Sequence, residues 1–268
     1  MSLDADLRAN RPRQALQGLQ VLVKQQPGNL QHRSRVFQLL CILGEWDRAQ
    51  TQLILLPELD QVDGDLMLAA PAYLSLIECE KFREEVFAGK RTPLIFGEPF
   101  EWLGLLIESL RALAQGQTET AVTLRAKACA AAPASPGRLN DKPFEWISDA
   151  DERLGPVLEV MLGGKYYWVP FCRLREVAIE APASLHDRVW LPGEFTWTNG
   201  GQAQGYIPVR YPGTPATNDG ALQMAAALLW KEQGQGLVQG LGQRLLATDA
   251  ADVPLLKVRA IQLDAIEF

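Results

Sequence analysis

The chain has 268 residues, of which 47% are hydrophobic and 22% charged, and its formal net charge at pH 7 is −6. These values are typical of a soluble globular protein with one large or two modest domains, and they exclude the disordered, collagen-like and coiled-coil classes. The acidic charge balance, an acidic N-terminus without a signal-peptide core and the lack of a long apolar run predict a cytoplasmic protein with no nucleic-acid partner and no membrane insertion.

The first half of the chain, residues 1–135, has the pattern of paired helices with a weak internal repeat. A turn residue followed by a small residue is typical of tetratricopeptide-like hairpins, in which the small residue lets two helices approach closely. The matching positions are Asn10 and Ala15, then Gly44 and Ala49 after 34 residues, then Gly116 and Ala121. The pattern predicts two or three degenerate helical hairpins, and a plain helical bundle with accidental spacing remains the alternative.

A break separates this half from the rest. The apolar segment Asp65–Gly89 still has a helical pattern, but the run Pro133–Gly137 contains two prolines and a glycine. Proline removes a backbone donor and glycine costs backbone entropy, so a helix cannot continue through this run. We therefore predict a domain boundary here, with a helical domain over 1–135 and a second domain over 138–268.

The second half changes to a period of two and to strand-forming residues. Two hairpins are predicted, each around a glycine pair, and further strands follow from alternating or apolar runs. The predicted strands are Pro156–Leu162, Lys165–Phe171, Arg175–Glu180, Glu194–Thr198, Gln202–Tyr211, Leu237–Thr248 and Leu255–Leu263. The Ala/Leu-rich segment Thr217–Gln233, with Asn218 or Asp219 as its N-cap, predicts the one main helix of this domain. The fold class is α+β, with a tetratricopeptide-like helical domain before a β-rich domain.

The cysteines and histidines indicate no metal centre. Cys41, Cys79, Cys129 and Cys172 are widely spaced, with no pair at ligand spacing, and the chain has two histidines. A structural zinc site is therefore not expected. Four scattered cysteines in apolar surroundings predict buried free thiols in a reducing compartment.

Asp149 and Asp151 admit two interpretations. Two carboxylates at positions i and i+2 can hold Mg²⁺ or Mn²⁺ through a nucleotide phosphate, because hard cations prefer oxygen ligands. Both are also residues that cap the start of a helix, and Arg153 follows closely enough to pair with one of them. Because no nucleotide-binding pattern lies nearby, we expect the capping role, with no metal and no cofactor.

An aromatic run on one predicted strand supplies the candidate partner-binding residues. Tyr166 and Trp168 share one face of this strand, and Tyr167 and Phe171 share the other. One face has to fill the core, and the other would then expose aromatic surface, which is enriched at protein interfaces. These four residues are therefore the predicted contact site, and burial of both faces remains the alternative.

The second half also resembles a known family as a whole. The similarity covers essentially the full chain, but its specific motifs are concentrated in residues 144–260. The matching segments are Phe144–Glu159, Gly164–Phe171, Val189–Trp190, Pro208–Gly213, Gly240–Arg244 and Thr248–Asp249. On these motifs the chain resembles the ImpE family, also called TagJ or SciE, which accompanies type VI secretion clusters in bacteria.

The resemblance implies an accessory, non-catalytic protein of the secretion apparatus. Its implied partner is the small subunit of the contractile sheath, bound through a groove that takes a helix or an extended segment, with an indirect influence on the AAA+ unfoldase that recycles the sheath. The residues themselves yield no catalytic set. Two alternatives stay open: a metal-dependent enzyme that uses Asp149 and Asp151, and a generic helical-repeat scaffold outside secretion.

Overall fold

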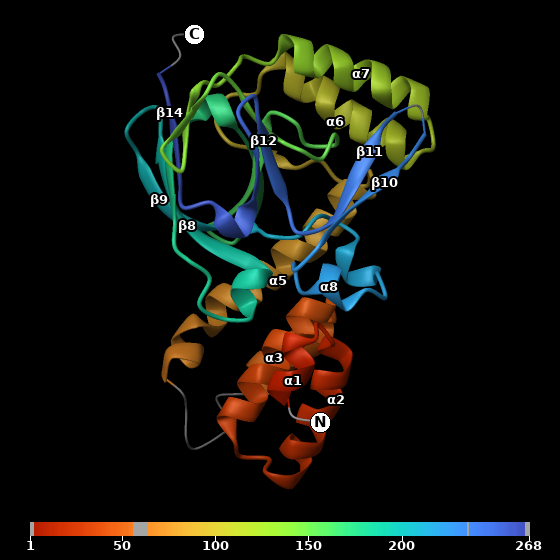
Figure 1. Ribbon diagram of the computed structural model, residues 1–268, viewed down its shortest axis with the longest axis vertical. Coiled ribbons are helices and arrows are strands. Elements are labelled where there is room, and N and C mark those ends of the chain that lie inside the picture. Colours follow the sequence, from red (N-terminus) through yellow and green to blue (C-terminus); the bar gives the residue numbers. More distant parts are fainter. Residues whose placement is uncertain (1–2, 56–63, 235, 266–268) are drawn as a thin grey trace.

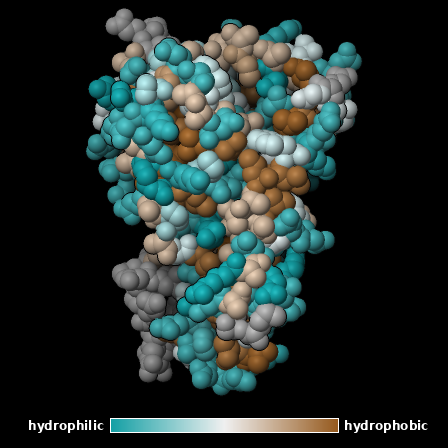
Figure 2. All heavy atoms as spheres, viewed as in Figure 1, coloured by the Kyte–Doolittle hydropathy of each residue, from teal (hydrophilic) through white to brown (hydrophobic). Residues whose placement is uncertain are grey.

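The computed structural model describes residues 3–55, 64–234 and 236–265. The helices of the first half are α1 (Leu3–Arg8), α2 (Pro12–Gln25), α3 (Leu30–Leu43), α4 (Trp46–Leu55), α5 (Gly64–Phe87), α6 (Glu101–Ala114) and α7 (Thr118–Ala131). Figure 1 shows α1, α2 and α3 at one end of the molecule, and α6 and α7 beside the strands at the other end. Figure 2 shows the elongated outline of the molecule in the same view. The long helix α5 runs between these two groups.

The predicted repeat is visible in the backbone. Asn10, Gly44 and Gly116 have positive φ angles of 52°, 68° and 75°, and each stands two residues before a helix, α2, α4 or α7. The alanines five positions further on have at most 1% of their surface exposed: Ala15, Ala49 and Ala121. The turn residue thus reverses the chain and the alanine packs in the core, which confirms the predicted helical hairpins.

Apart from one short strand between α5 and α6, the strands begin at the end of the run Pro133–Gly137, where α7 gives way to β structure as predicted. They are β1 (Leu94–Ile95), β2 (Gly137–Leu139), β3 (Lys142–Phe144), β4 (Ile147–Asp149), β5 (Val157–Leu162), β6 (Lys165–Pro170), β7 (Leu174–Ile179), β8 (Trp190–Trp197), β9 (Gln202–Pro208), β10 (Leu228–Glu232), β11 (Val238–Gly242), β12 (Leu245–Thr248), β13 (Asp252–Pro254) and β14 (Ala260–Leu263). In the described residues they form a nine-stranded sheet, β1-β6-β5-β9-β8-β7-β14-β2-β3, a three-stranded sheet, β13-β12-β4, and the ribbon β10-β11. The α+β class is confirmed.

The two predicted hairpins are confirmed. Gly163 and Gly164 join β5 to β6 with φ angles of 56° and 74°, as a two-residue turn of type I′ requires. β8 and β9 form the second hairpin, although β8 begins at Trp190, four residues before the predicted start. The predicted strand Leu237–Thr248 is divided into β11 and β12, because Gly242 has a φ angle of 91° that a continuous strand cannot contain.

The helix predicted over Thr217–Gln233 is wrong. Asp219 does cap a helix, through hydrogen bonds from two main-chain N–H groups, but that helix, α8, covers only Gly220–Gln223. Ala225 then turns the chain with a φ angle of 51°, and β10 follows, pairing over its full length with β11. The ladder of β10 with β11 outweighs the helical preference of alanine and leucine, which is a weak one.

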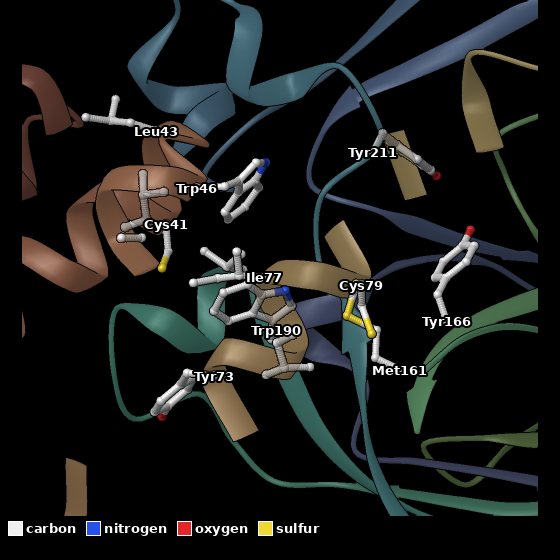
Figure 3. Close-up of a cluster of buried hydrophobic side chains, with 14 of the residues drawn as sticks. Cys41, Leu43, Trp46, Tyr73, Ile77, Cys79, Met161, Tyr166, Trp190 and Tyr211 are labelled. Carbon is white, nitrogen blue, oxygen red and sulfur yellow. The ribbon is translucent and has the colours of Figure 1, made fainter. Parts of the chain in front are cut away.

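The core crosses the predicted domain boundary. The alternating side chains of β5 and β6 divide between two cores, so that Met161 and Trp168 pack with the helices and Val160 packs on the opposite face of the sheet. Figure 3 shows Trp46 and Tyr73 from the helices close to Trp190 of β8, with ring centroids 6.0 and 6.2 Å from that indole. Separate folding of the two predicted domains stays a prediction.

Candidate functional site: a buried charge cluster beside an aromatic groove

The aromatic residues predicted to bind a partner lie mostly inside the protein. Tyr166, Trp168 and Phe171 are at most 2% exposed, and Tyr167 is partly exposed, with its ring against Phe96. The expectation of one open face is wrong, because helices cover one side of β6 and the second core covers the other. Partner binding by these four residues stays a prediction, and only Tyr167 has exposed surface for a contact.

Beneath these rings, Glu159 forms the centre of a buried charge cluster. It stands in the middle of β5, has no exposed surface and points toward α5. The guanidinium of Arg83 from α5 binds it in a bidentate manner, with Nε to Oε1 at 2.6 Å and Nη2 to Oε2 at 2.9 Å. Arg244 Nη2 and the Tyr166 hydroxyl also donate to this carboxylate, and Trp168 Nε1 donates to the Tyr166 oxygen at 2.7 Å.

Arg244 extends the cluster to Asp149. Its Nη1 lies 3.4 Å from Asp149 Oδ2, and the Tyr211 hydroxyl donates to Asp149 Oδ1 at 2.9 Å. Burial raises the pKa of Asp149 to about 6, although Arg244 acts in the opposite direction. Burial also lowers the pKa of Arg244 to about 10. Neutral pH is therefore close to the pKa of Asp149 but well below that of Arg244, which stays charged.

Asp151 accepts a bidentate contact from Arg153, at 2.9 and 2.6 Å, and the Gly240 N–H donates to it at 2.8 Å. The predicted Arg153 pair is thus confirmed. The predicted helix cap is wrong, because a turn and not a helix follows β4, and Asp149 Oδ1 accepts the Asp151 N–H within that turn. Among the described residues no group of three metal-ligating side chains comes together.

Arg210 connects the cluster to the N-terminal helices. Its guanidinium donates to the carbonyls of Cys41, at 3.1 Å, and Ile42, which lie in the last turn of α3. A third bond goes to the carbonyl of Gln223 at 2.9 Å. Cations are favoured at the C-terminal ends of helices, where carbonyls lack partners. Burial lowers the pKa of Arg210 to about 10.

The cluster as a whole balances its charge. Four arginines and four carboxylates, each at most 8% exposed, join α3 and α5 to the strands: Glu80, Arg83, Asp149, Asp151, Arg153, Glu159, Arg210 and Arg244. Buried charges are tolerated when they are paired and hydrogen-bonded. The contacts of Arg83 from α5 with Glu159, and of Arg210 with the carbonyls of α3, fix these helices against the strands.

One wall of the cluster is also the floor of an open groove of about 620 Å³. The floor is a face of the three-stranded sheet, where Ser148, Ala247 and Asp252 lie side by side in register. These side chains are short, and Asp149 and Leu245 also line the groove. The sheet face therefore remains open to an incoming chain segment, whereas an independent sheet face is normally covered by another layer.

Two tryptophans flank this groove. Trp146 precedes β4 and is 42% exposed, and Trp230 stands on β10 and is 38% exposed. Helix α7 also lines the groove, with Arg125 and Cys129. Cys129 is exposed, contrary to the prediction of four buried thiols. Glu152 also lines the groove and binds Arg125 Nη2 at 2.7 Å.

Sequence reasoning missed these groove residues for identifiable reasons. Trp230 was assigned to the Ala/Leu-rich helix that the structure replaces with β10. Trp146 stands in a recognised motif but carries no periodic pattern of its own. Glu159 did leave a signal, because a carboxylate within the apolar run Val157–Met161 needs a buried cation, but its partners are 76 and 85 residues away.

Comparisons with known proteins agree with this architecture. The family model described as ImpE protein matches residues 141–262. A curated relative, the type VI secretion system accessory component TagJ of Pseudomonas aeruginosa strain PAO1, is 43% identical over 258 residues, which cover 96% of this chain and 89% of the relative. The X-ray crystal structure of protein VPA1032 from Vibrio parahaemolyticus has the same fold, with a TM-score of 0.89 over 99% of this chain and 98% of that one, at 24% identity.

The fold and its groove define an α+β protein in which helical hairpins are fixed to a β-rich region by buried charges. No helix in the described part of the chain is long and apolar enough to cross a membrane. The relative's identity extends over both halves, and the family match contains Asp149, Glu159 and Arg244. The chain belongs to the ImpE family.

Proposed function

We propose that this chain is a non-catalytic accessory protein of a type VI secretion system that binds the small subunit of the contractile sheath. The observation that carries the proposal is its 43% identity, over 96% of its length, to a protein named as an accessory component of that system. The proposal includes a cytoplasmic location and an indirect influence, through the sheath, on the AAA+ unfoldase that recycles it.

The groove between Trp146 and Trp230 is the surface we assign to this contact. Exposed aromatic side chains beside a hollow are the residues on which binding energy typically concentrates. The short floor side chains, Ser148 and Ala247, let a helix or an extended segment approach the sheet closely. Tyr167 lies outside this groove, so the groove and the predicted aromatic strand are separate candidates.

The geometry gives less support to a metal-dependent enzyme. Both carboxylate oxygens of Asp151 accept hydrogen bonds, from Arg153 and from the Gly240 N–H. Asp149 contacts Arg244 and Tyr211. A divalent cation would have to displace these bonds. Calorimetric titration of the folded chain with Mg²⁺ and Mn²⁺ tests this alternative, and stoichiometric binding that Asp149→Asn abolishes would establish it.

A pull-down with purified sheath subunits tests the proposal. The full chain is immobilised and offered the small subunit, the large subunit and their mixture in separate experiments. We expect retention of the small subunit alone and of the mixture, and no retention of the large subunit alone. Retention of neither subunit by the folded, monodisperse chain would contradict the proposal and leave the generic scaffold.

A further inference from the structure

A second candidate surface lies on the nine-stranded sheet, on the part of one face that the helices do not cover. Along β8, alternate residues Trp190, Pro192 and Glu194 point to the same face. Trp190 is fully buried beneath α4 and α5, Pro192 is half-buried and Glu194 is exposed. The helices therefore cover one end of this face and leave the other end uncovered by any described residue.

The open end of this face is hollowed. In register across the strands lie Ala178, Glu194 and Gln204, and the next row pairs Pro192 with Tyr206. Together with Glu180, which directly follows β7, these residues line a cavity of about 470 Å³. Tyr206 is opposite Met161 and packs against the helix-covered core, so the hollow has a firm, partly apolar floor.

The charge around the hollow is unbalanced. Glu180 and Glu194 are exposed, and neither carboxylate has an ion pair or a hydrogen bond within the described ranges. Arg259 also lines the hollow, but its guanidinium donates to the carbonyls of Leu256, at 2.8 Å, and Val258. The residues that line the hollow thus include two carboxylates and one cation, and a net negative charge remains.

We infer that this face, the β7–β9 hollow, is a docking surface for a basic amphipathic helix of a protein partner. Helices cover the same face over Trp190, and a further helix beside them would complete that layer. Lysine or arginine stems would pack on Tyr206 and Pro192 while their charged ends meet Glu180 and Glu194. The charge complementarity selects a basic occupant, since an acidic one would face two unpaired carboxylates.

The inference is independent of the sheath contact. The Trp146/Trp230 groove also has carboxylates in its lining, but Glu152 pairs there with Arg125 and Asp149 pairs with Arg244. Both glutamates of the β7–β9 hollow, in contrast, lack an ion pair within the described ranges. The lining residues of the two surfaces are entirely different. A protein with both surfaces can hold two partners at once.

Fluorescence anisotropy with a labelled synthetic peptide tests the inference. The probe is an amphipathic helix with lysines on one face and leucine and alanine beside them, and its control carries glutamate in place of lysine. We expect the lysine peptide alone to bind, and to bind more weakly at higher salt, since ions screen exposed charges. The double variant Glu180→Gln/Glu194→Gln and the single variant Gln204→Arg should each weaken its binding at least tenfold.

A matched control separates this site from general attraction to an acidic chain. Glu98→Gln/Glu119→Gln removes the same charge from two exposed residues outside the hollow, and it should change the affinity less than twofold. Trp230→Ala should likewise leave peptide binding unchanged, whatever it does to sheath binding. Absence of lysine-peptide binding, or equal weakening by the two double variants, would overturn the inference. Circular dichroism melts verify that each variant is folded.

Discussion

The charge cluster and the aromatic groove are neighbours, but the cluster buries charged side chains and the groove exposes aromatic ones. In the cluster, Arg83, Glu159 and Arg244 are inside the protein, whereas the groove leaves Trp146 and Trp230 at the surface. Charged side chains are almost never fully buried unless they are paired, and large aromatic side chains are mostly buried. The difference indicates two tasks: buried charges that fix the architecture, and exposed rings that are available to a partner.

Removing the central carboxylate tests the structural half of this comparison most severely. Glu159→Ala leaves the Arg83 and Arg244 guanidinium groups buried without their shared anion. Breaking one buried ion pair costs about 3–5 kcal/mol, and we expect a loss near the upper end because two cations are affected. Urea denaturation measures the change in the free energy of unfolding. Glu98→Ala, at an exposed position, is the matched control and should change it by less than about 0.5 kcal/mol. A comparable loss in both variants would contradict the structural role of the cluster.

The aromatic strand gives a second, slightly smaller contrast. Trp168→Ala should lower the free energy of unfolding by about 3–5 kcal/mol, the usual range for a fully buried aromatic residue. Tyr167→Ala should cost less than half as much, because that ring is partly exposed. Thermal and chemical denaturation of the two variants measure this difference. An equal loss would mean that the two faces of β6 are buried alike.

Asp149 joins the two regions, and its ionisation makes a prediction about pH. Its pKa in the folded chain is about 6, above the ordinary value of 3.8, because burial disfavours the charged form. Between these two pKa values the folded chain holds a proton on Asp149 that the unfolded chain has lost. The group therefore stabilises the fold at low pH, and this contribution is lost as the pH rises through about 6. The variant Asp149→Asn should therefore gain roughly 2–3 kcal/mol relative to the wild type between pH 4 and pH 7. Denaturation curves of the two proteins at matched pH measure the gain, and a difference that is independent of pH would be inconsistent with a raised pKa.

The smallest effect on stability is expected in the groove. Trp146→Ala/Trp230→Ala should lower the free energy of unfolding by about 1 kcal/mol or less, since both residues stand at the surface and are 42% and 38% exposed. A loss of several kcal/mol in urea denaturation would show that these rings are structural, and the contrast between cluster and groove would then fail.

Local signals in the sequence were sufficient for much of this architecture. Gly163 and Gly164 indicated a turn that requires positive φ angles, and the spacing of Gly44 and Ala49 indicated a helical hairpin. Such features depend on neighbouring residues alone. The helix prediction for Thr217–Gln233 failed because part of this segment pairs as β10 with β11, which lies further along the chain. Local helix propensity contains no information about that pairing.

The candidate site was less accessible to prediction. The pair Asp151 and Arg153 was found because its members are two residues apart. The contacts of Glu159 with Arg83 and Arg244 join distant segments, and they depend on how α5 lies across β5. Exposure of Trp230 also follows from tertiary pairing, so no local pattern marks it as a surface residue.

Calorimetric titration of the full chain with the purified small sheath subunit tests the central claim most directly. The account predicts saturable binding by the wild type and at least about tenfold weaker binding by Trp146→Ala/Trp230→Ala. The control Val21→Ala/Ile54→Ala removes exposed apolar groups from α2 and α4, far from the groove residues in the chain, and should keep the affinity of the wild type. Absence of binding by the folded wild type, or equal affinity of the tryptophan variant, would contradict the account.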